Sequence, residues 1–592
     1  MKKRLMCMLL CAIMVLSVLM TGCSGQGASE EDIAGAGIRE VQTLVVYLMS
    51  EDPVDQKTEN AVEDAINELT KSKFKTQLDL HFFTEDVYYE KVEEKLKAKE
   101  KEIKAAEKAA KDKKKYEKWL RESCKEAGIS YVPVTTPKPE TVVTEEATLV
   151  DADYGIIKYV YPDPEPNQLD IFYVGGYENY MKYVNENWLA RLNDEIDMSS
   201  KKLKEHIPSI YMDNVRDSSN NGIYGIPTNS AIGTYTWLLL NKELMENYFY
   251  TEDSINYLLD SDTSTAMDED FYNFLNDVNT YERDKYVPLR GELEPVNIFY
   301  WTMNTETLRL TNEPSVIGSA FSPIAMKGTP LTVSNLFGTV EYTNQIKMIK
   351  RFEFAGFFEK EGEEDKPFAA SVVKGGYDIF EKYSDEYYVK MIERPRASED
   401  DIYSDMLCVG AMEDNIARAM EIVTYINTNS APRNIIQYGI EGENYYVDDF
   451  GVLHRYNQAY MMDVKKTGNV FMAHPEEGRS PDYWDEWVSQ IEDSRVYPTF
   501  GFIIEWSSKP DTEKIVVLQE LYNDYMDRLN ACTTVEEIDA FFTEAKEEIN
   551  ANEDFLYVKN ANYGSEETDT NPNSPIMKLY WNWLLDNDYV GD

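Results

Sequence analysis

The stretch that decides the fold class is a strand–helix–strand pattern, with VQTLVVYL at residues 41–48 and TQLDLHFF at residues 76–83. The first segment is short, apolar and rich in β-branched residues. The second alternates apolar and polar side chains, so both segments are typical of β-strands. Residues 59–69 between them repeat apolar side chains at helical spacing. Two parallel strands joined by a helix predict an α/β fold with helices covering the sheet.

Further strands and helices follow along the chain. Strand candidates are residues 169–174 (LDIFYV), 223–227, 234–241 and 387–393. Helical spacing is clear at residues 340–354, 416–426, 513–529 and 536–551. At roughly 100–200 residues per domain, a chain of 592 residues should form two to four domains.

A basic segment interrupts the pattern. Residues 91–125 hold 14 Lys and Arg against 8 Asp and Glu, and most of them favour helix. Residues 131–146, which contain three prolines, follow as a semi-rigid connector. One interpretation is a solvated helical insertion without a ligand. The other is an arm that contacts a partner protein or an acidic surface polymer.

The amino terminus has the layout of an export signal. Lys2, Lys3 and Arg4 precede an uncharged, mostly apolar run at residues 5–20, which is short for a membrane span. The run ends in Leu-Met-Thr-Gly-Cys, which resembles the lipobox of bacterial lipoproteins, with Met in place of the usual Leu three residues before the cysteine. The resemblance implies a signal peptide at 1–22, acylation of Cys23 and a flexible tether at 23–39. The alternative is a cleaved signal or a short anchor without lipid.

Charge and composition argue against several function classes. The chain carries 59 Lys and Arg against 107 Asp and Glu, a formal net charge of −48, which repels nucleic-acid phosphates. Only four histidines occur, and the phosphate-binding, zinc-protease and serine-hydrolase motifs are absent. Cys124, Cys408 and Cys532 are too far apart in sequence for a metal knuckle. The sequence therefore predicts no catalytic residues, no metal and no cofactor.

Aromatic residues recur near the ends of the predicted strands. Sugar rings have apolar C–H faces and hydroxyl edges, so a sugar site needs flat aromatic platforms together with carboxylates and amides. In open α/β sheets, ligands bind beyond the carboxyl ends of the strands. Any one of these rings alone is better explained by core packing, and only the set points to a sugar site. The rings are Tyr173, Tyr177, Tyr235, Trp301, Tyr377 and Tyr438.

Several motifs together are similar to those of the extracellular solute-binding proteins of ABC importers, in particular the carbohydrate-type family 1 lipoproteins. The motifs are LDIF at 169–172 with two glycines after it, NGIYGIP at 221–227, TYTWLLLNKEL at 234–244, RAMEI at 418–422 and NIIQYGIEG at 434–442. The resemblance covers nearly the whole mature chain except residues 91–146. It implies an α/β, two-lobed periplasmic-binding-protein-like fold of type II, with the long helical insertion in lobe one.

The resemblance also implies an organisation and a site. The chain would cross between lobes near 225–229, 394–398 and 430–434, so that lobe one holds 40–225 plus 397–432 and lobe two holds 226–396 plus 433–592. The ligand would bind in a cleft between the lobes without covalent chemistry. The cleft candidates are Glu51, Asp52, Tyr173, Tyr177, Thr228, Asn229, Tyr235, Trp301, Tyr377, Tyr438 and Glu441.

The function that the sequence predicts is capture of a carbohydrate, a neutral oligosaccharide, and its delivery to a membrane permease. The protein would be a monomer held by its lipid on the extracellular face of a bacterial membrane. Three alternatives stay open: a binder of a peptide or another solute, a surface adhesin that uses the basic arm, and a secreted glycosidase.

Overall fold

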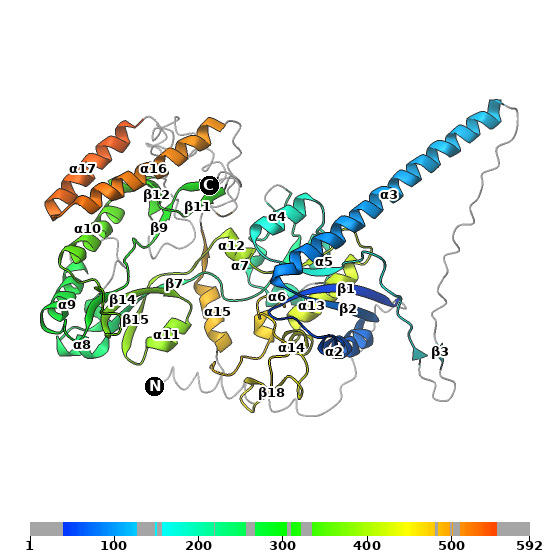
Figure 1. Ribbon diagram of the computed structural model, residues 1–592, viewed down its shortest axis with the longest axis horizontal. Helices are drawn as coiled ribbons and strands as arrows, with labels where there is room; N and C mark the ends of the chain where they lie inside the picture. Colours follow the sequence, from blue (N-terminus) through cyan, green and yellow to red (C-terminus); the bar gives the residue numbers. More distant parts are fainter. Residues whose placement is uncertain are drawn as a thin grey trace.

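The protein forms two α/β lobes that lie side by side, and helix α3 (Glu85–Glu126) projects from one of them (Figure 1). The computed structural model describes residues 40–126, 149–150, 157–199, 201–217, 220–255, 267–304, 309–320, 334–479, 483–497, 500 and 509–552. The expectations for the signal peptide, for Cys23 and the tether, and for the connector at 131–146 concern residues outside these ranges.

Lobe one is built on a five-stranded sheet with the order β2-β1-β5-β17-β6. Strand β1 is parallel to β2 and to β5, whereas β17 is antiparallel to β5 and to β6. Since β17 follows β6 only after the whole sheet of lobe two, the chain leaves lobe one and returns to complete its sheet. The bounds are β1 Gln42–Ser50, β2 Thr76–Thr84, β5 Ile171–Val174, β6 Gly225–Pro227 and β17 Met406–Val409.

The predicted strand–helix–strand unit is confirmed by β1, helix α2 (Gln56–Phe74) and β2. Asp55 caps α2 by accepting a hydrogen bond from the Thr58 amide at 2.9 Å. Eight consecutive residues of β1, Thr43 to Ser50, are buried, because helices cover both faces of the sheet around this strand. The other helices of lobe one are α4 Tyr177–Asn185, α5 Asn193–Ser199, α6 Lys201–His206, α7 Ser209–Met212, α12 Glu399–Ile402, α13 Ile416–Thr428 and α14 Ser430–Tyr438.

Lobe two contains a four-stranded sheet with the order β15-β7-β14-β8. Strand β7 is antiparallel to β14 and β15, and β8 is parallel to β14. Its strands are β7 Tyr235–Asn241, β8 Val287–Arg290, β14 Phe368–Gly375 and β15 Tyr387–Glu393, and its helices include α8 Lys242–Asn247, α9 Met267–Tyr281, α10 Val340–Phe354 and α11 Asp378–Tyr383.

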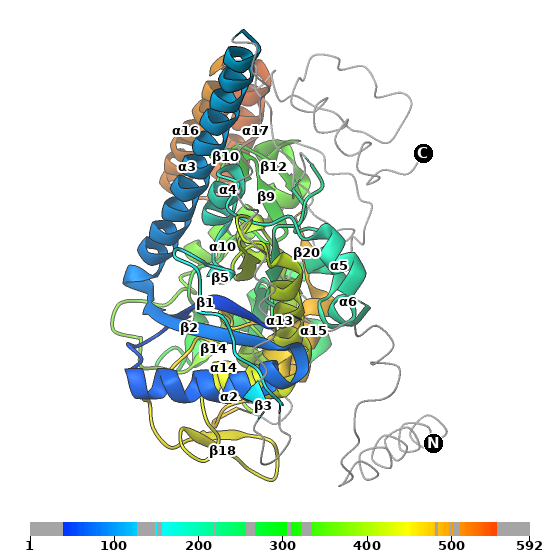
Figure 2. The same cartoon turned by 90° about the vertical axis from the view of Figure 1, so that its right-hand side faces the viewer.

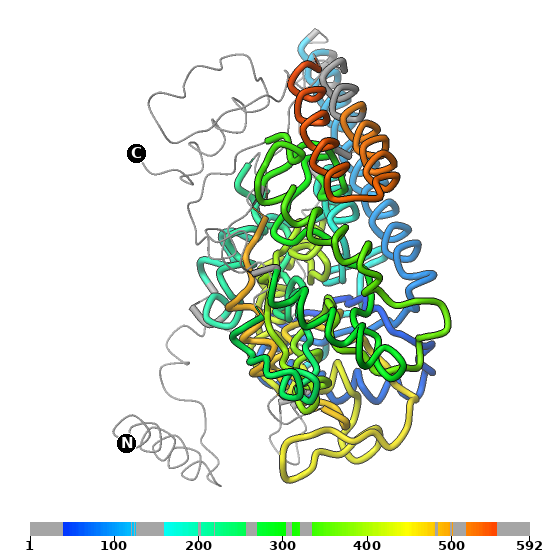
Figure 3. The backbone as a smooth tube through the Cα atoms, turned by 90° about the vertical axis from the view of Figure 1, so that its left-hand side faces the viewer, coloured from blue at the N-terminus to red at the C-terminus, as the bar shows by residue number. Residues whose placement is uncertain are grey.

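A second layer of lobe two has its own hydrophobic core, and α16 and α17 lie at its far end, orange and red in Figure 3. Trp301, Tyr342 and Phe337 pack there against the two C-terminal helices. The elements of this layer are β9 Ile298–Tyr300, β10 Thr302–Asn304, β11 Arg309–Thr311, β12 Ile317–Ala320, β13 Ser334–Asn335, α16 Lys509–Ala531 and α17 Val535–Ala551.

Within the described ranges three chain segments connect the lobes, and the third differs from the expected position. The first runs from β6 to β7 and the second from β15 through β16 (Arg396–Ala397) to β17. We expected the third at 430–434, but Ile436, Tyr460 and Met462 belong to the core of lobe one. The chain reaches the core of lobe two again only at Tyr497.

The segment after α14 stays with lobe one for a physical reason. Arg433 is fully buried and donates hydrogen bonds to the carbonyls of Val464, Gly468 and Asn469. The third connection therefore follows α15 (Tyr483–Asp493), which lies between the lobes in Figure 1, and includes β20 (Arg495–Val496). Between α14 and α15 lie β18 Tyr445–Val447, β19 Leu453–Arg455 and the short helix η4 Val470–Met472.

Candidate ligand-binding site

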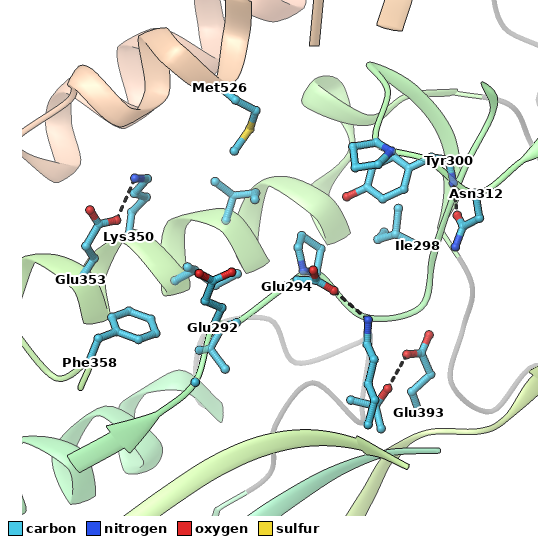
Figure 4. A pocket seen from close by; sticks show the side chains of 18 of the residues that line it. Glu292, Glu294, Ile298, Tyr300, Asn312, Lys350, Glu353, Phe358, Glu393 and Met526 are labelled. Carbon is cyan, nitrogen blue, oxygen red and sulfur yellow. Dashed lines mark hydrogen bonds and ion pairs between the residues drawn. The ribbon is translucent and has the colours of Figure 1, made fainter. Parts of the chain in front are cut away.

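A cavity of about 1190 Å³ opens in lobe two, with side chains from the β8–β9 loop, α10 and α16 around it (Figure 4). Its volume exceeds the range of about 300–1,000 Å³ that is common for sites of drug-sized ligands, so it has room for a ligand of several sugar rings. Carboxylates, rings and a few cations line it together. The lining includes Glu292, Glu294, Tyr300, Asn312, Lys350, Glu353, Phe358, Lys374, Glu393, Arg394, Tyr497, Tyr522 and Met526.

The loop between β8 and β9 supplies two of the carboxylates. Gly291 has a φ of +83°, a conformation that glycine adopts without strain, and it turns the chain at the end of β8. Leu293 is buried, so Glu292 and Glu294 on either side of it stay exposed. Lys374 Nζ lies 2.8 Å from Glu294 Oε2, which orients that carboxylate in the cavity (Figure 4).

A cluster of tyrosines forms the aromatic side of the cavity. The ring centroids of Tyr300 and Tyr522 are 6.0 Å apart, and Tyr300 meets the buried Tyr342 edge-on. Burial raises the pKa of Tyr300 and of Tyr522, so both hydroxyls stay protonated and can donate at neutral pH. Asn312 accepts from the Tyr300 amide at 2.7 Å and donates to the Tyr497 hydroxyl at 3.4 Å.

The cavity also takes residues from all three connections between the lobes. Thr234 and Thr236 end the first connection, Arg394 and Arg396 begin the second, and Tyr497 ends the third. Next to Arg394, Glu393 accepts from Thr236 Oγ1 at 2.8 Å and from the Asn297 amide at 2.9 Å. A ligand in this cavity would therefore contact the segments on which relative movement of the lobes depends.

The lining of the cavity carries more acidic than basic side chains, as the whole chain does. Seven glutamates and five lysines and arginines line it. Among the described residues, no group of His, Cys, Asp and Glu is arranged to hold a metal ion. The arrangement can bind hydroxyl groups through carboxylate acceptors and tyrosine donors, while ring faces cover the apolar side of a sugar.

None of the eleven residues predicted as cleft contacts lines this cavity. Trp301 is fully buried and donates from Nε1 to Ser319 Oγ at 2.9 Å. Tyr438 is buried and donates to the His474 carbonyl at 2.7 Å, and Tyr235 is buried and donates to Asp493 Oδ2 at 3.0 Å. In this structure these three rings are parts of the core and present no open face to a ligand.

Some of the other predicted residues come together at the carboxyl edge of the lobe-one sheet. The Tyr173 hydroxyl donates to Asp405 Oδ1 at 2.7 Å, and the Thr228 amide donates to the Asp405 carbonyl at 2.9 Å. Glu51 follows β1, and partial burial, together with nearby Asp463, raises its pKa. Asp52 next to it is exposed.

The remaining predicted residues are dispersed. Tyr177 packs against Tyr403, with ring centroids 5.1 Å apart, and Tyr377 packs against Phe380 at the same distance. Asn229 lines a separate cavity of about 370 Å³ beside α15. Glu441 is exposed on the loop after α14.

Sequence reasoning missed the cavity residues although a signal for them exists. The sequence Gly-Glu-Leu-Glu-Pro at 291–295 directly follows the strand VPLR, and glycine with carboxylates at a strand end is typical of a binding loop. Tyr300 lies next to the predicted Trp301. Because successive residues in an extended segment face opposite sides, only one of these two rings can face the cavity.

Comparisons with known proteins agree with the architecture. No family model and no curated protein sequence matches the chain. A crystal structure of the N-glycan transport solute binding protein NgtS from Streptococcus pneumoniae matches 92% of this chain and 100% of its own, at 14% identity and a TM-score of 0.51.

A second solved structure has a lower TM-score. An extracellular solute-binding protein from Bifidobacterium longum subsp. infantis matches 94% of this chain and 99% of its own, at 12% identity and a TM-score of 0.43. The chain therefore has the two-lobed α/β fold of the pneumococcal solute binding protein.

Proposed function

We propose that this chain is the extracellular substrate-binding component of an ABC transporter, which captures a neutral oligosaccharide and delivers it to a membrane permease. The observation that carries the proposal is the cavity of about 1190 Å³, in which tyrosines and glutamates face the same space. The fold agrees with this role because it provides two lobes joined by three connecting segments.

Ligand selectivity follows from the charge of the cavity. The lining glutamates outnumber the cations, and the whole chain carries a formal net charge of −48. An anionic sugar would meet like charge and lose its own hydration, whereas hydroxyl groups can donate to the carboxylates. We therefore propose neutral saccharides as the substrate class.

Binding would act on the connections between the lobes. The ligand would contact residues of all three connections, so it can favour one relative position of the lobes over another. The permease would recognise the ligand-bound arrangement. No reaction of the sugar is part of this role.

We also propose that the protein is held on the extracellular face of the membrane by acylation of Cys23. The tether after Cys23 would leave both lobes in solution. No helix in the described ranges is both long enough and apolar enough to span a membrane.

A thermal-shift screen of the mature protein against neutral mono- and oligosaccharides tests the proposal. A saccharide at about 100 times its Kd should add about 2.7 kcal/mol to the free energy of unfolding. Glu294→Gln removes a charged acceptor and should raise the Kd about tenfold. Tyr300→Leu, which removes the ring and hydroxyl but keeps apolar volume, should weaken binding similarly.

Two exposed residues outside the cavity provide matched controls. Glu246→Gln on α8 and Tyr446→Leu on β18 should leave the Kd unchanged. If no saccharide stabilises the protein, or if both cavity variants keep the wild-type Kd, the proposed site is wrong. Cleavage products after prolonged incubation would contradict the binding role itself.

A further inference from the structure

Helix α3 is divided into a packed part and a projecting part. Tyr88, Val92 and Leu96 are buried in the core of lobe one, and Lys99 is the last of the described side chains of the helix that is buried. From Lys104 to Lys118 every side chain is exposed except that of Glu117, which is partly exposed. Figures 1 and 2 show the helix continuing well beyond the sheet of lobe one. At 1.5 Å per residue, the part beyond Lys99 is about 40 Å long.

The projecting part leaves the body beside the point where the chain enters the fold. Lys99 Nζ lies 3.2 Å from Glu165 Oε2, and the Glu165 amide donates to Gln168 Oε1 at 2.8 Å. Gln168 Nε2 in turn donates to the Thr43 carbonyl at 2.9 Å, at the start of β1. The projecting part of α3, called the arm below, and the chain that precedes β1 therefore leave lobe one from the same edge of its sheet.

The arm has a charge opposite to that of the rest of the chain. Between Lys108 and Lys125, eight lysines and arginines face three acidic residues, in a chain with a net charge of −48. Near its end, Tyr116 and Trp119 are 60% and 57% exposed and stack with ring centroids 5.8 Å apart. Clustered cations with exposed Trp and Tyr are typical of segments that lie at the interface of an anionic membrane.

We propose that the projecting part of α3 docks on the anionic headgroups of the membrane to which Cys23 would attach the chain. This inference rests in part on the proposed lipid anchor. The 16 residues between Cys23 and Glu40 can span about 55 Å when extended, which exceeds the length of the arm. The lipid at one end and the arm at the other can therefore contact the same surface.

The geometry also resolves an electrostatic conflict. A body as acidic as this one is repelled by an anionic membrane, but at physiological ionic strength that repulsion decays over about 8 Å. Along the helix, Lys108 lies about 14 Å beyond Lys99, so the cationic segment can reach the headgroups while the sheet edge of lobe one stays farther away than this decay length. Headgroup contact is thus confined to the one segment with excess positive charge.

Vesicle co-sedimentation of the mature chain carrying Cys23→Ala tests the proposal. This variant cannot be acylated, so binding reports the arm alone. We expect it to bind vesicles containing phosphatidylglycerol and not pure phosphatidylcholine vesicles, and binding should weaken as salt increases. Replacing five lysines of the arm with glutamine should lower the partition coefficient at least about 100-fold. The substitutions are Lys108→Gln, Lys111→Gln, Lys114→Gln, Lys115→Gln and Lys118→Gln. Trp119→Ser should lower it by a smaller factor.

The matched control replaces five exposed lysines of the two lobes with glutamine and should bind vesicles like the Cys23→Ala chain. The substitutions are Lys57→Gln, Lys73→Gln, Lys285→Gln, Lys382→Gln and Lys546→Gln. Equal binding of the arm variant and the control variant would overturn the proposal. So would arm-dependent self-association in sedimentation without vesicle binding, which would assign the arm to the acidic surface of a second copy. Saccharide binding, measured on the same arm variant, should be unchanged, so failure of this inference is distinguishable from failure of the proposed function.

Discussion

Asp170 is a fully buried carboxylate that joins two strands of lobe one. It accepts hydrogen bonds from the Val45 amide at 2.8 Å and from Gln168 Nε2 at 2.7 Å. Its pKa is raised to about 7, chiefly by burial and also by Glu413, against the opposing effects of the two hydrogen bonds and of Lys99. The aspartate of the LDIF motif therefore has a structural role between β1 and β5.

This raised pKa predicts a pH dependence of stability. The folded state has the higher pKa, so between about pH 4 and pH 7 it binds more protons than the unfolded chain, and the free energy of unfolding falls as the pH rises through this range. The loss is of the order of 4 kcal/mol. Urea denaturation of Asp170→Asn should lack this part of the slope, whereas the exposed control Asp52→Asn should keep it. Identical slopes for wild type and Asp170→Asn would contradict the assignment.

The buried Trp301 predicts a loss of stability on truncation. Trp301→Ala should lower the free energy of unfolding of lobe two by about 3–5 kcal/mol, because it leaves a cavity in a core and removes the hydrogen bond from Trp301 Nε1 to Ser319 Oγ. The thermal transition of the ligand-free protein measures this loss. Trp119→Ala, at an exposed position, is the control and should change little. A Trp301→Ala protein of normal stability that fails to bind saccharide would instead restore Trp301 to the ligand site.

At the scale of the element, the position of α14 depends on one buried cation. Arg433 donates to three carbonyls between Val464 and Asn469 and to Gln437 Oε1 at 3.1 Å. Burial lowers its pKa to about 10, so the guanidinium still carries its charge at neutral pH. This network fixes the loop at residues 464–469 onto lobe one.

Removing that cation should release the segment. Arg433→Met leaves several buried carbonyls without donors and should destabilise lobe one by more than about 2 kcal/mol. Hydrogen exchange measures the local effect, and the amides of Lys466 and Asn469 should exchange at least about tenfold faster. The exposed Arg191→Met serves as the control. Unchanged exchange at these amides would show that the segment is held by other contacts.

Sequence periodicity predicted single elements well and their assembly less well. The helix expected at 340–354 and the strand expected at 387–393 are α10 and β15 with the same bounds, because hydrophobic spacing is a local property. The lobe to which α14 belongs depends on Arg433 reaching a segment about 30 residues away, which no local pattern encodes. The cavity was missed for the same reason, since its walls come from segments between residues 234 and 530.

At the scale of the whole molecule, the three connections form one hydrogen-bonded unit. Strands β16 and β20 pair in parallel, which joins the second connection to the third. From the end of α15, Ser494 Oγ donates to the Ile232 carbonyl at 2.8 Å in the first connection. Asp493 accepts from Tyr235 of the first connection and from Arg394 of the second, each at 3.0 Å. Movement of one lobe relative to the other must therefore strain or rearrange contacts at the end of α15.

Asp493 does not line the cavity, but its partner Arg394 does. The contacts at the end of α15 and the binding of a ligand should therefore be energetically coupled. The ion pair is about 40% exposed on both sides, which limits its contribution to about 1 kcal/mol. Asp493→Asn should therefore raise the Kd for a saccharide about threefold, and Asp197→Asn, which breaks an exposed pair within lobe one, should not. In a double-mutant cycle with Arg394→Met, the two changes should be less than additive, because each removes the same contact. Strict additivity in the calorimetric affinities would mean that Arg394 binds the ligand independently of Asp493, and the end of α15 would then have no part in ligand recognition.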